Sequence, residues 1–144
     1  MKSAWIVVAD ASRARFFSAE LPASPLCEIE TLSNPEARLH EGDLISDRGG
    51  RDRDSGGSSH GFGSAGTAKE EIADRFAADV SARLESGRER NAFYRLYVLG
   101  SPSFLGMLRK HQSPSLRRLV VDEIAKDMTM RTPEQIRAQL PDRL

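Results

Sequence analysis

Arginine is the residue type in this sequence that most clearly indicates a binding chemistry. Seventeen of the 21 basic side chains are arginine, whose planar guanidinium binds phosphate and carboxylate oxygens in pairs. Residues 83–118 hold eight basic and two acidic side chains, a net charge of +6. This composition fits an anion-facing patch, and it also fits solvated helix faces with local ion pairs. The candidate anion-binding or RNA-binding residues are Arg95, Arg109, Lys110, Arg117, Arg118 and Ser101.

Ser101 belongs to a second kind of candidate, a strand that runs directly into a helix. The segment Gly100-Ser101-Pro102-Ser103 follows a predicted strand and opens a predicted helix. The free N–H groups of such a helix start bind anions, and Arg95 and Arg109 are near in sequence. An ordinary Ser-Pro helix start explains the same residues.

A glycine-rich segment in the middle of the chain is a further candidate. Seven of the eleven glycines lie between Gly49 and Gly66. Such a segment buries too little surface to offset the entropy of ordering it, so we predict a flexible loop at about 46–66. It is either a binding loop that orders on a partner or a tolerated insertion. A histidine and an aromatic residue on a loop suit stacking on bases. The loop residues singled out are Gly49, Gly50, Arg51, Gly56, Gly57, His60 and Phe62.

Acidic and nucleophilic residues give no defined catalytic pattern. A two-metal nuclease needs several carboxylates that converge on the ions. Asp10 ends the first predicted strand and Asp122 lies in the last, and four more aspartates lie near the glycine-rich segment, but no defined spacing joins them. The single cysteine, Cys27, is predicted to be an ordinary buried thiol. We therefore predict no catalytic residue, no metal and no cofactor. Those four aspartates are Asp43, Asp47, Asp52 and Asp54.

Length and composition bound the class of protein. The chain has 144 residues, of which 39% are hydrophobic and 29% charged, and this predicts one globular domain over residues 1–144. Its 21 acidic residues balance its 21 basic ones, which excludes binding of nucleic acid through an overall basic excess. We expect no recognition of DNA sequence. The apolar run Ala4–Ala9 is too short for a signal peptide or a membrane span, so we expect a cytoplasmic location and no membrane partner.

The elements that must position these residues follow from local patterns. Thr67 and Glu70 form a capping box, and a stripe of apolar residues from Ile72 to Leu84 predicts a helix that Gly87 stops. Ser101, Ser113 and Thr132, each followed by proline, predict three more helix starts. Five strands are predicted, at residues 5–9, 13–18, 26–32, 93–99 and 119–124.

The order β-β-β-α-β-α-β-α indicates the fold class. Three strands in succession predict an antiparallel meander, and the later strands, each separated by a helix, predict right-handed crossovers. The sequence therefore predicts an α/β fold in a single domain, with a mixed five-stranded sheet flanked by helices.

Several segments, taken in order, carry a family resemblance. They are WIVVADASRARFF, LSNPEARLHEGDLISDRGGR, KEEIADRFAADVSARL, LGSPSFLGMLRK and IAKDMT. Together they resemble the bacterial host attachment protein family. That family's fold is similar to the middle domain of eukaryotic and archaeal peptide-chain release factors, so the resemblance implies a ribonuclease H-like sheet.

The resemblance also bears on function. In those release factors the loop before the first long helix carries Gly-Gly-Gln, and its Gln directs hydrolysis of peptidyl-tRNA. The loop here has Gly49-Gly50-Arg51 and Gly56-Gly57-Ser58 and no Gln. The resemblance thus implies a non-enzymatic binding protein with RNA or the ribosome as partner. The alternative is a hydrolase acting on tRNA-linked or phosphodiester substrates, and an envelope or adhesion role follows from the family's name.

Overall fold

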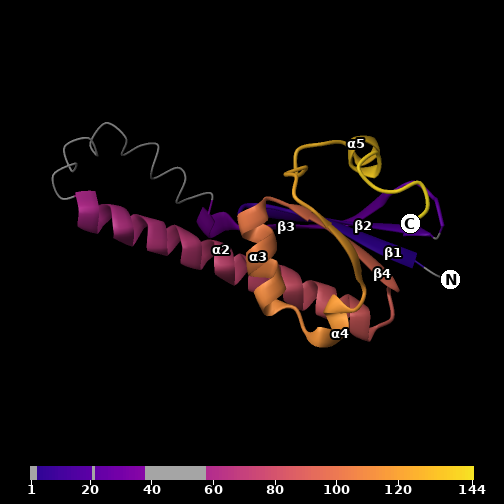
Figure 1. Ribbon diagram of the computed structural model, residues 1–144, viewed down its shortest axis with the longest axis horizontal. Helices are drawn as coiled ribbons and strands as arrows, with labels where there is room; N and C mark the ends of the chain where they lie inside the picture. Colours follow the sequence, from indigo (N-terminus) through magenta and orange to yellow (C-terminus); the bar gives the residue numbers. More distant parts are fainter. Residues whose placement is uncertain (1–2, 21, 38–57) are drawn as a thin grey trace.

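The computed structural model describes residues 3–20, 22–37 and 58–144, and the side chains from residue 68 onward in the last range. The chain forms one five-stranded sheet in the order β3-β2-β1-β4-β5, with helices on both sides (Figure 1). The elements are β1 (Ser3–Ala9), β2 (Arg13–Glu20), β3 (Cys27–Ser33), α2 (Ser58–Glu89), β4 (Arg95–Gly100), α3 (Pro102–His111), α4 (Pro114–Arg117), β5 (Val120–Ile124) and α5 (Pro133–Arg137).

The sheet is mixed, as the sequence predicts. β1, β2 and β3 pair antiparallel as a meander, whereas β1, β4 and β5 pair in parallel through helical crossovers. β1 lies at the centre, and every residue from Ala4 to Ala9 is buried. A strand covered on both faces reads as a continuous apolar run, which is the pattern seen in the sequence. The α/β class is confirmed, and the strand order is consistent with the ribonuclease H-like arrangement.

Two hydrophobic cores lie on the two faces of the sheet. On one face Trp5, Val7 and Phe16 pack with the buried side chains of α2, α3 and α4. On the other face Ile6 and Tyr97 pack with residues of the C-terminal segment that contains α5. Figure 1 shows α2, α3 and α4 on one side of the sheet and α5 on the other. The side chains of β1 alternate between these two cores, as the period of two in a strand requires.

The long helix α2 begins earlier than the sequence predicts. It starts at Ser58, nine residues before Thr67, so Thr67 is an interior helical residue and the predicted capping box there is wrong. Once residues 67–89 are helical, each added residue gains a hydrogen bond without a new nucleus. His60 and Phe62 therefore lie in α2 and not in a loop, and their side chains are outside the described part. Gly49, Gly50, Arg51, Gly56 and Gly57 lie outside the described residues altogether.

The end of α2 also differs from the prediction. Gly87 does not stop the helix, which continues to Glu89. The stop is Asn91, whose φ of 58° is left-handed. Its N–H bonds to the carbonyl of Arg88 and the N–H of Ala92 bonds to the carbonyl of Gly87, both at 2.9 Å. These two bonds form a Schellman motif, in which asparagine replaces the more usual glycine.

The shorter elements match the sequence, with one exception on β3. Ser101, Ser113 and Thr132 are N-caps of α3, α4 and α5, as predicted. Cys27, however, is exposed, so the predicted burial of its thiol is wrong. β3 is an edge strand, and its residues are exposed or half-buried along its whole length.

None of the described helices is long and apolar enough to cross a membrane.

Candidate ligand-binding site between α3, α4 and β5

Helix α2 holds α3 and α4 in place through polar contacts. The hydroxyl of Ser81 donates to the carbonyl of Leu108 at 3.4 Å. The hydroxyl of Ser113 donates to Glu85 at 2.6 Å and accepts from the N–H of Leu116 at 3.1 Å. One side chain therefore caps α4 and ties it to α2. This fixes the position of the residues that follow in α4.

Closer to the start of α2, Asp74 contacts two residues at the end of α3. Its carboxylate lies 3.3 Å from the Lys110 ammonium and 3.1 Å from Nε2 of His111. The hydrogen bond from His111, followed by the one from Lys110, lowers the pKa of Asp74 below its usual value. Similarly, the hydrogen bond from Arg88, followed by that from Ser113, lowers the pKa of Glu85. Both carboxylates are thus held in the charged form that accepts these bonds.

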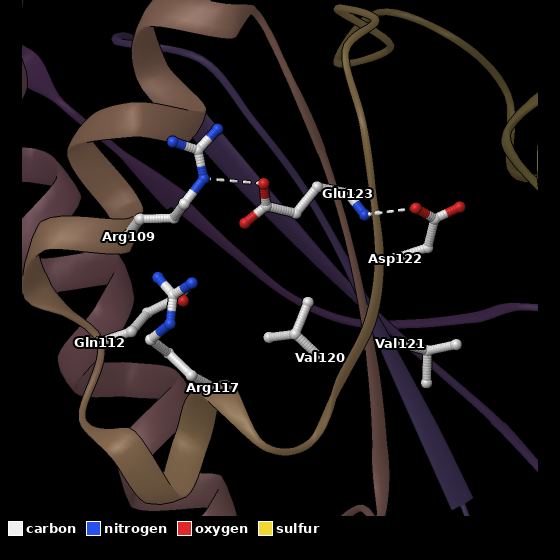
Figure 2. A pocket seen from close by; sticks show the side chains of 7 residues that line it. All are labelled: Arg109, Gln112, Arg117, Val120, Val121, Asp122 and Glu123. Carbon is white, nitrogen blue, oxygen red and sulfur yellow. Dashed lines mark hydrogen bonds and ion pairs between the residues drawn. The ribbon is translucent and has the colours of Figure 1, made fainter.

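Strand β5 carries an irregularity that shapes the site. Leu96 of β4 pairs with Val120, but the next residue, Tyr97, pairs with Asp122, so Val121 is an extra residue in β5. Because of this bulge, Val120 and Glu123 face the same side, although residues three apart in a regular strand face opposite sides. Figure 2 shows Val120 and Glu123 pointing toward α3 and α4, with Val121 and Asp122 pointing the other way.

A pocket of about 410 Å³ lies between these elements (Figure 2). Its charged groups are partly compensated, because Nε of Arg109 donates to Oε1 of Glu123 at 2.8 Å. The guanidinium of Arg117 is exposed, and no side chain among the described residues bonds to it. The lining holds two arginines and two carboxylates, so its formal charges cancel, and Arg117 is the cation of the lining without a side-chain partner among the described residues. The lining residues are Arg109, Gln112, Arg117, Val120, Val121, Asp122 and Glu123.

Gln112 is the most unusual residue of this pocket. It is the C-cap of α3, and only 8% of it is exposed. Neither its side-chain oxygen nor its side-chain nitrogen has a hydrogen-bond partner among the described residues. A buried polar group left without a partner costs about 1–3 kcal/mol. A ligand that accepts from the side-chain nitrogen and donates to the side-chain oxygen would remove this cost. Sequence reasoning missed Gln112, because the run Lys110–Ser113 gives no sign that its glutamine is buried.

The other predicted site residues lie in different places. Arg118 follows Arg117 at the end of α4 and is exposed. Arg95, in contrast, opens β4, and its guanidinium donates to the carbonyl of Leu144 at 2.9 Å. Ser101 follows the opposite end of β4, and its hydroxyl accepts from the N–H of Phe104 at 3.4 Å. The structure therefore brings Arg109 and Arg117 to one pocket. It places Lys110 against Asp74 of α2 and Arg118 at the end of α4, and it places Arg95 and Ser101 at opposite ends of β4.

The two acidic candidates within the described residues have structural partners. Asp10 accepts from the N–H groups of Ser12 and Arg13 at 2.8 and 2.9 Å and from the hydroxyl of Thr129 at 2.9 Å. Asp122 accepts from the N–H of Glu123 at 2.9 Å. Within residues 3–20, 22–37 and 58–144, no three His, Cys, Asp or Glu side chains form a group that holds a metal ion. Asp43, Asp47, Asp52 and Asp54 lie outside the described residues.

A second pocket, of about 510 Å³, lies on the other face of the sheet, beside the start of α5. Among the described residues, three arginines line it, namely Arg13, Arg15 and Arg131. The Nε and Nη2 of Arg15 donate to the two carboxylate oxygens of Glu28 at 3.0 and 2.9 Å. The remaining donors of Arg15 reach the carbonyls of Thr129 and Arg131. Arg15 is therefore used to join β2, β3 and the C-terminal segment. The first pocket is taken as the candidate site because Gln112, whose amide has no partner among the described residues, lines it.

Comparison with known proteins finds a similar fold among the solved structures and a matching protein family. The crystal structure of an archaeal translation termination factor, aRF1, matches the chain with a TM-score of 0.50 and 12% sequence identity. The match covers 95% of this chain and 37% of that chain, so the present fold corresponds to a little over a third of the archaeal protein. No curated protein sequence matches the chain.

A family model described as "Protein required for attachment to host cells" matches residues 5–140. The chain belongs to this family, as the sequence resemblance indicates. The family description records an attachment phenotype and leaves the biochemical activity open.

Proposed function

We propose that this protein binds RNA through a basic surface at the ends of α3 and α4. This surface, the α3–α4 basic surface, consists of Arg109, Lys110, Arg117 and Arg118. The observation that carries the proposal is the exposed pair Arg117 and Arg118, whose guanidinium groups have no partner among the described side chains. Glu123 and Asp74 compensate Arg109 and Lys110, so the surface keeps a positive excess for phosphate groups.

Two further arguments favour RNA over another anion. The surface adjoins a pocket with an unpartnered amide, and RNA offers both phosphates for the surface and unpaired bases for a pocket. The fold is also similar to a translation termination factor, a protein that by its name acts in translation. Ribosomal RNA is therefore the first RNA to test, and a cytoplasmic location follows from this proposal.

Salt-dependent binding of a single-stranded RNA tests the proposal. The logarithm of the association constant falls with the logarithm of the salt concentration, with a slope of roughly −0.7 per phosphate contact. The double variant Arg117→Ala/Arg118→Ala should therefore bind more weakly, with a slope smaller by roughly 1.4. Fluorescence anisotropy with a labelled oligonucleotide measures both quantities.

The matched control is the double variant Arg131→Ala/Arg143→Ala. It removes the same charge from two exposed arginines of the C-terminal segment, which covers the other face of the sheet. Binding and slope should stay close to those of the unmodified protein. RNA binding that is absent at low salt, or that falls equally in both double variants, refutes the α3–α4 basic surface as the RNA contact. Recovery of the protein from the cell envelope would contradict the cytoplasmic location.

A further inference from the structure

The pocket beside the basic surface contains a feature that binding of phosphates does not use. Both amide atoms of Gln112 are buried and unpartnered among the described residues, and Gln112 is one of the residues of α3, α4 and β5 that line the pocket. A phosphate group presents only acceptors, so it would satisfy the side-chain nitrogen of Gln112 and leave the oxygen unpaired. The group that fits must present a donor and an acceptor next to each other.

The base of adenosine has this pattern. Its N6 amino group is a donor and lies beside the N7 acceptor, and glutamine forms a pair of hydrogen bonds with these two atoms. Glu123, on the same side of β5 as Val120, offers a further acceptor to an amino group. Uracil has a carbonyl oxygen where adenine has the amino group, so it cannot donate to Glu123 from that position. We propose that this pocket binds a base that carries an amino group beside an acceptor nitrogen, with adenine as the probe and Gln112 pairing to its edge.

The remaining walls of the pocket suit a base as well. A volume of about 410 Å³ falls within the roughly 300–1,000 Å³ of small-molecule sites. Val120 supplies an apolar contact, and the planar guanidinium of Arg117 suits stacking on the face of a base. Each amide atom of Gln112 exposes less than 1 Å², so a base reaches it only after a side chain moves. Arg117 lines the same pocket and is exposed, with no partner among the described side chains, so its side chain can move without breaking a described bond.

Adenine can come from a free nucleotide or from an unpaired adenosine in RNA, and the latter source rests on the proposed function. Titrations with mononucleotides test the pocket independently of RNA binding. Adenosine 5′-monophosphate should bind roughly tenfold or more tightly than purine riboside 5′-monophosphate, which lacks only the amino group, and than uridine 5′-monophosphate. Backbone amide shifts in NMR spectra report both the affinity and the location of binding.

Two substitutions separate pairing by Gln112 from a general effect on folding. Gln112→Leu keeps the size of the side chain and removes the unpaired amide, so its melting temperature should be unchanged or raised. Its preference for adenosine 5′-monophosphate over the purine riboside should disappear. Gln112→Glu keeps an acceptor for the amino group and loses the donor to N7, so its preference should be weaker than that of the unmodified protein. A Gln112→Leu variant that folds and keeps the full preference would overturn the proposal.

Oligonucleotides then distinguish this proposal from the proposed function. If both hold, oligo(A) binds more tightly than oligo(U), and Gln112→Leu removes the difference while salt-dependent binding remains. Equal binding of oligo(A) and oligo(U), with no preference among the mononucleotides, refutes the adenine pocket and leaves the α3–α4 basic surface standing. Preferential binding of adenosine 5′-monophosphate without binding of either oligonucleotide supports the pocket and refutes the RNA proposal.

Discussion

Gly87→Ala is predicted to destabilise the protein, although alanine is the better helix former. Gly87 lies in the last turns of α2, where the helix packs against the ring of Trp5. A Cβ atom at this position would lie 2.7 and 2.8 Å from two ring carbons of Trp5 and 3.0 Å from a ring carbon of Phe93. The tryptophan cannot move away easily, because it is 5% exposed and stacks on Phe93 with ring centroids 4.8 Å apart.

The expected magnitude follows from two opposing effects. Replacement of an interior helical glycine by alanine stabilises a protein by up to about 1 kcal/mol. An extra methyl group in a packed core costs about 1–3 kcal/mol, so the net loss for Gly87→Ala should reach about 2 kcal/mol. Gly106→Ala in α3 is the matched control. Its Cβ would meet only a terminal nitrogen of Arg109, at 3.9 Å, so it should stabilise the protein by about 0.5–1 kcal/mol.

Urea denaturation of the two variants measures this difference. In thermal denaturation, the melting temperatures of the two variants should shift in opposite directions, by roughly 2–4 °C for each kcal/mol in a chain of this size. The near-ultraviolet circular dichroism of Gly87→Ala should also change, because the only tryptophan is the residue that the new methyl group contacts. Equal stabilisation by both substitutions would show that the close approach of α2 to Trp5 is not a packing constraint, and it would refute the reasoning.

Three further predictions concern stability. Thr132→Ala should cost about 1 kcal/mol in urea denaturation, because it removes the capping box with Gln135, and Thr132→Ser should cost much less. Leu108→Ala should cost about 2–5 kcal/mol, because the side chain is fully buried between α3 and α2; a cost below 1 kcal/mol would contradict that packing. The bond from Arg15 lowers the pKa of Glu28 below its usual 4.5, so the pair stabilises the fold above that pH and the stabilisation is lost as the pH falls through the lowered pKa. Melting curves of Glu28→Gln should accordingly show less stability at pH 7 and a flatter decline in acid than the unmodified protein.

Local signals in the sequence were sufficient for most elements of the fold. The Ser-Pro and Thr-Pro pairs at Ser101, Ser113 and Thr132 start helices because the capping side chain and the fixed φ of proline act within a single turn. The apolar run of β1 gives the central strand because burial on both faces leaves no polar position. These features depend on neighbours in sequence, so a pattern of a few residues contains the necessary information.

The predictions of the ends of α2 and of a buried Cys27 were wrong, because both features depend on other parts of the structure. Thr67 has the chemistry of an N-cap, but a helix that is already formed extends past it. Gly87 resembles a helix stop, whereas its position is set by the ring of Trp5, more than 80 residues earlier. The alternation in β3 predicts one buried face, but this strand lies at the edge of the sheet. Whether a strand is central or at an edge follows from the whole topology.

At the candidate site too, the sequence gives the residue types, whereas their partners and orientation depend on the fold. Arginine content marked Arg109 and Arg117 alike, yet Arg109 is tied to Glu123 and Arg117 has no partner among the described side chains. A regular period of two would place Val120 and Asp122 on one face of β5 and Val121 and Glu123 on the other. The bulge at Val121 changes this assignment and turns Glu123 toward α3. The same bulge gives the pocket the carboxylate of Glu123, so the chemistry we propose depends on one extra residue in an edge strand.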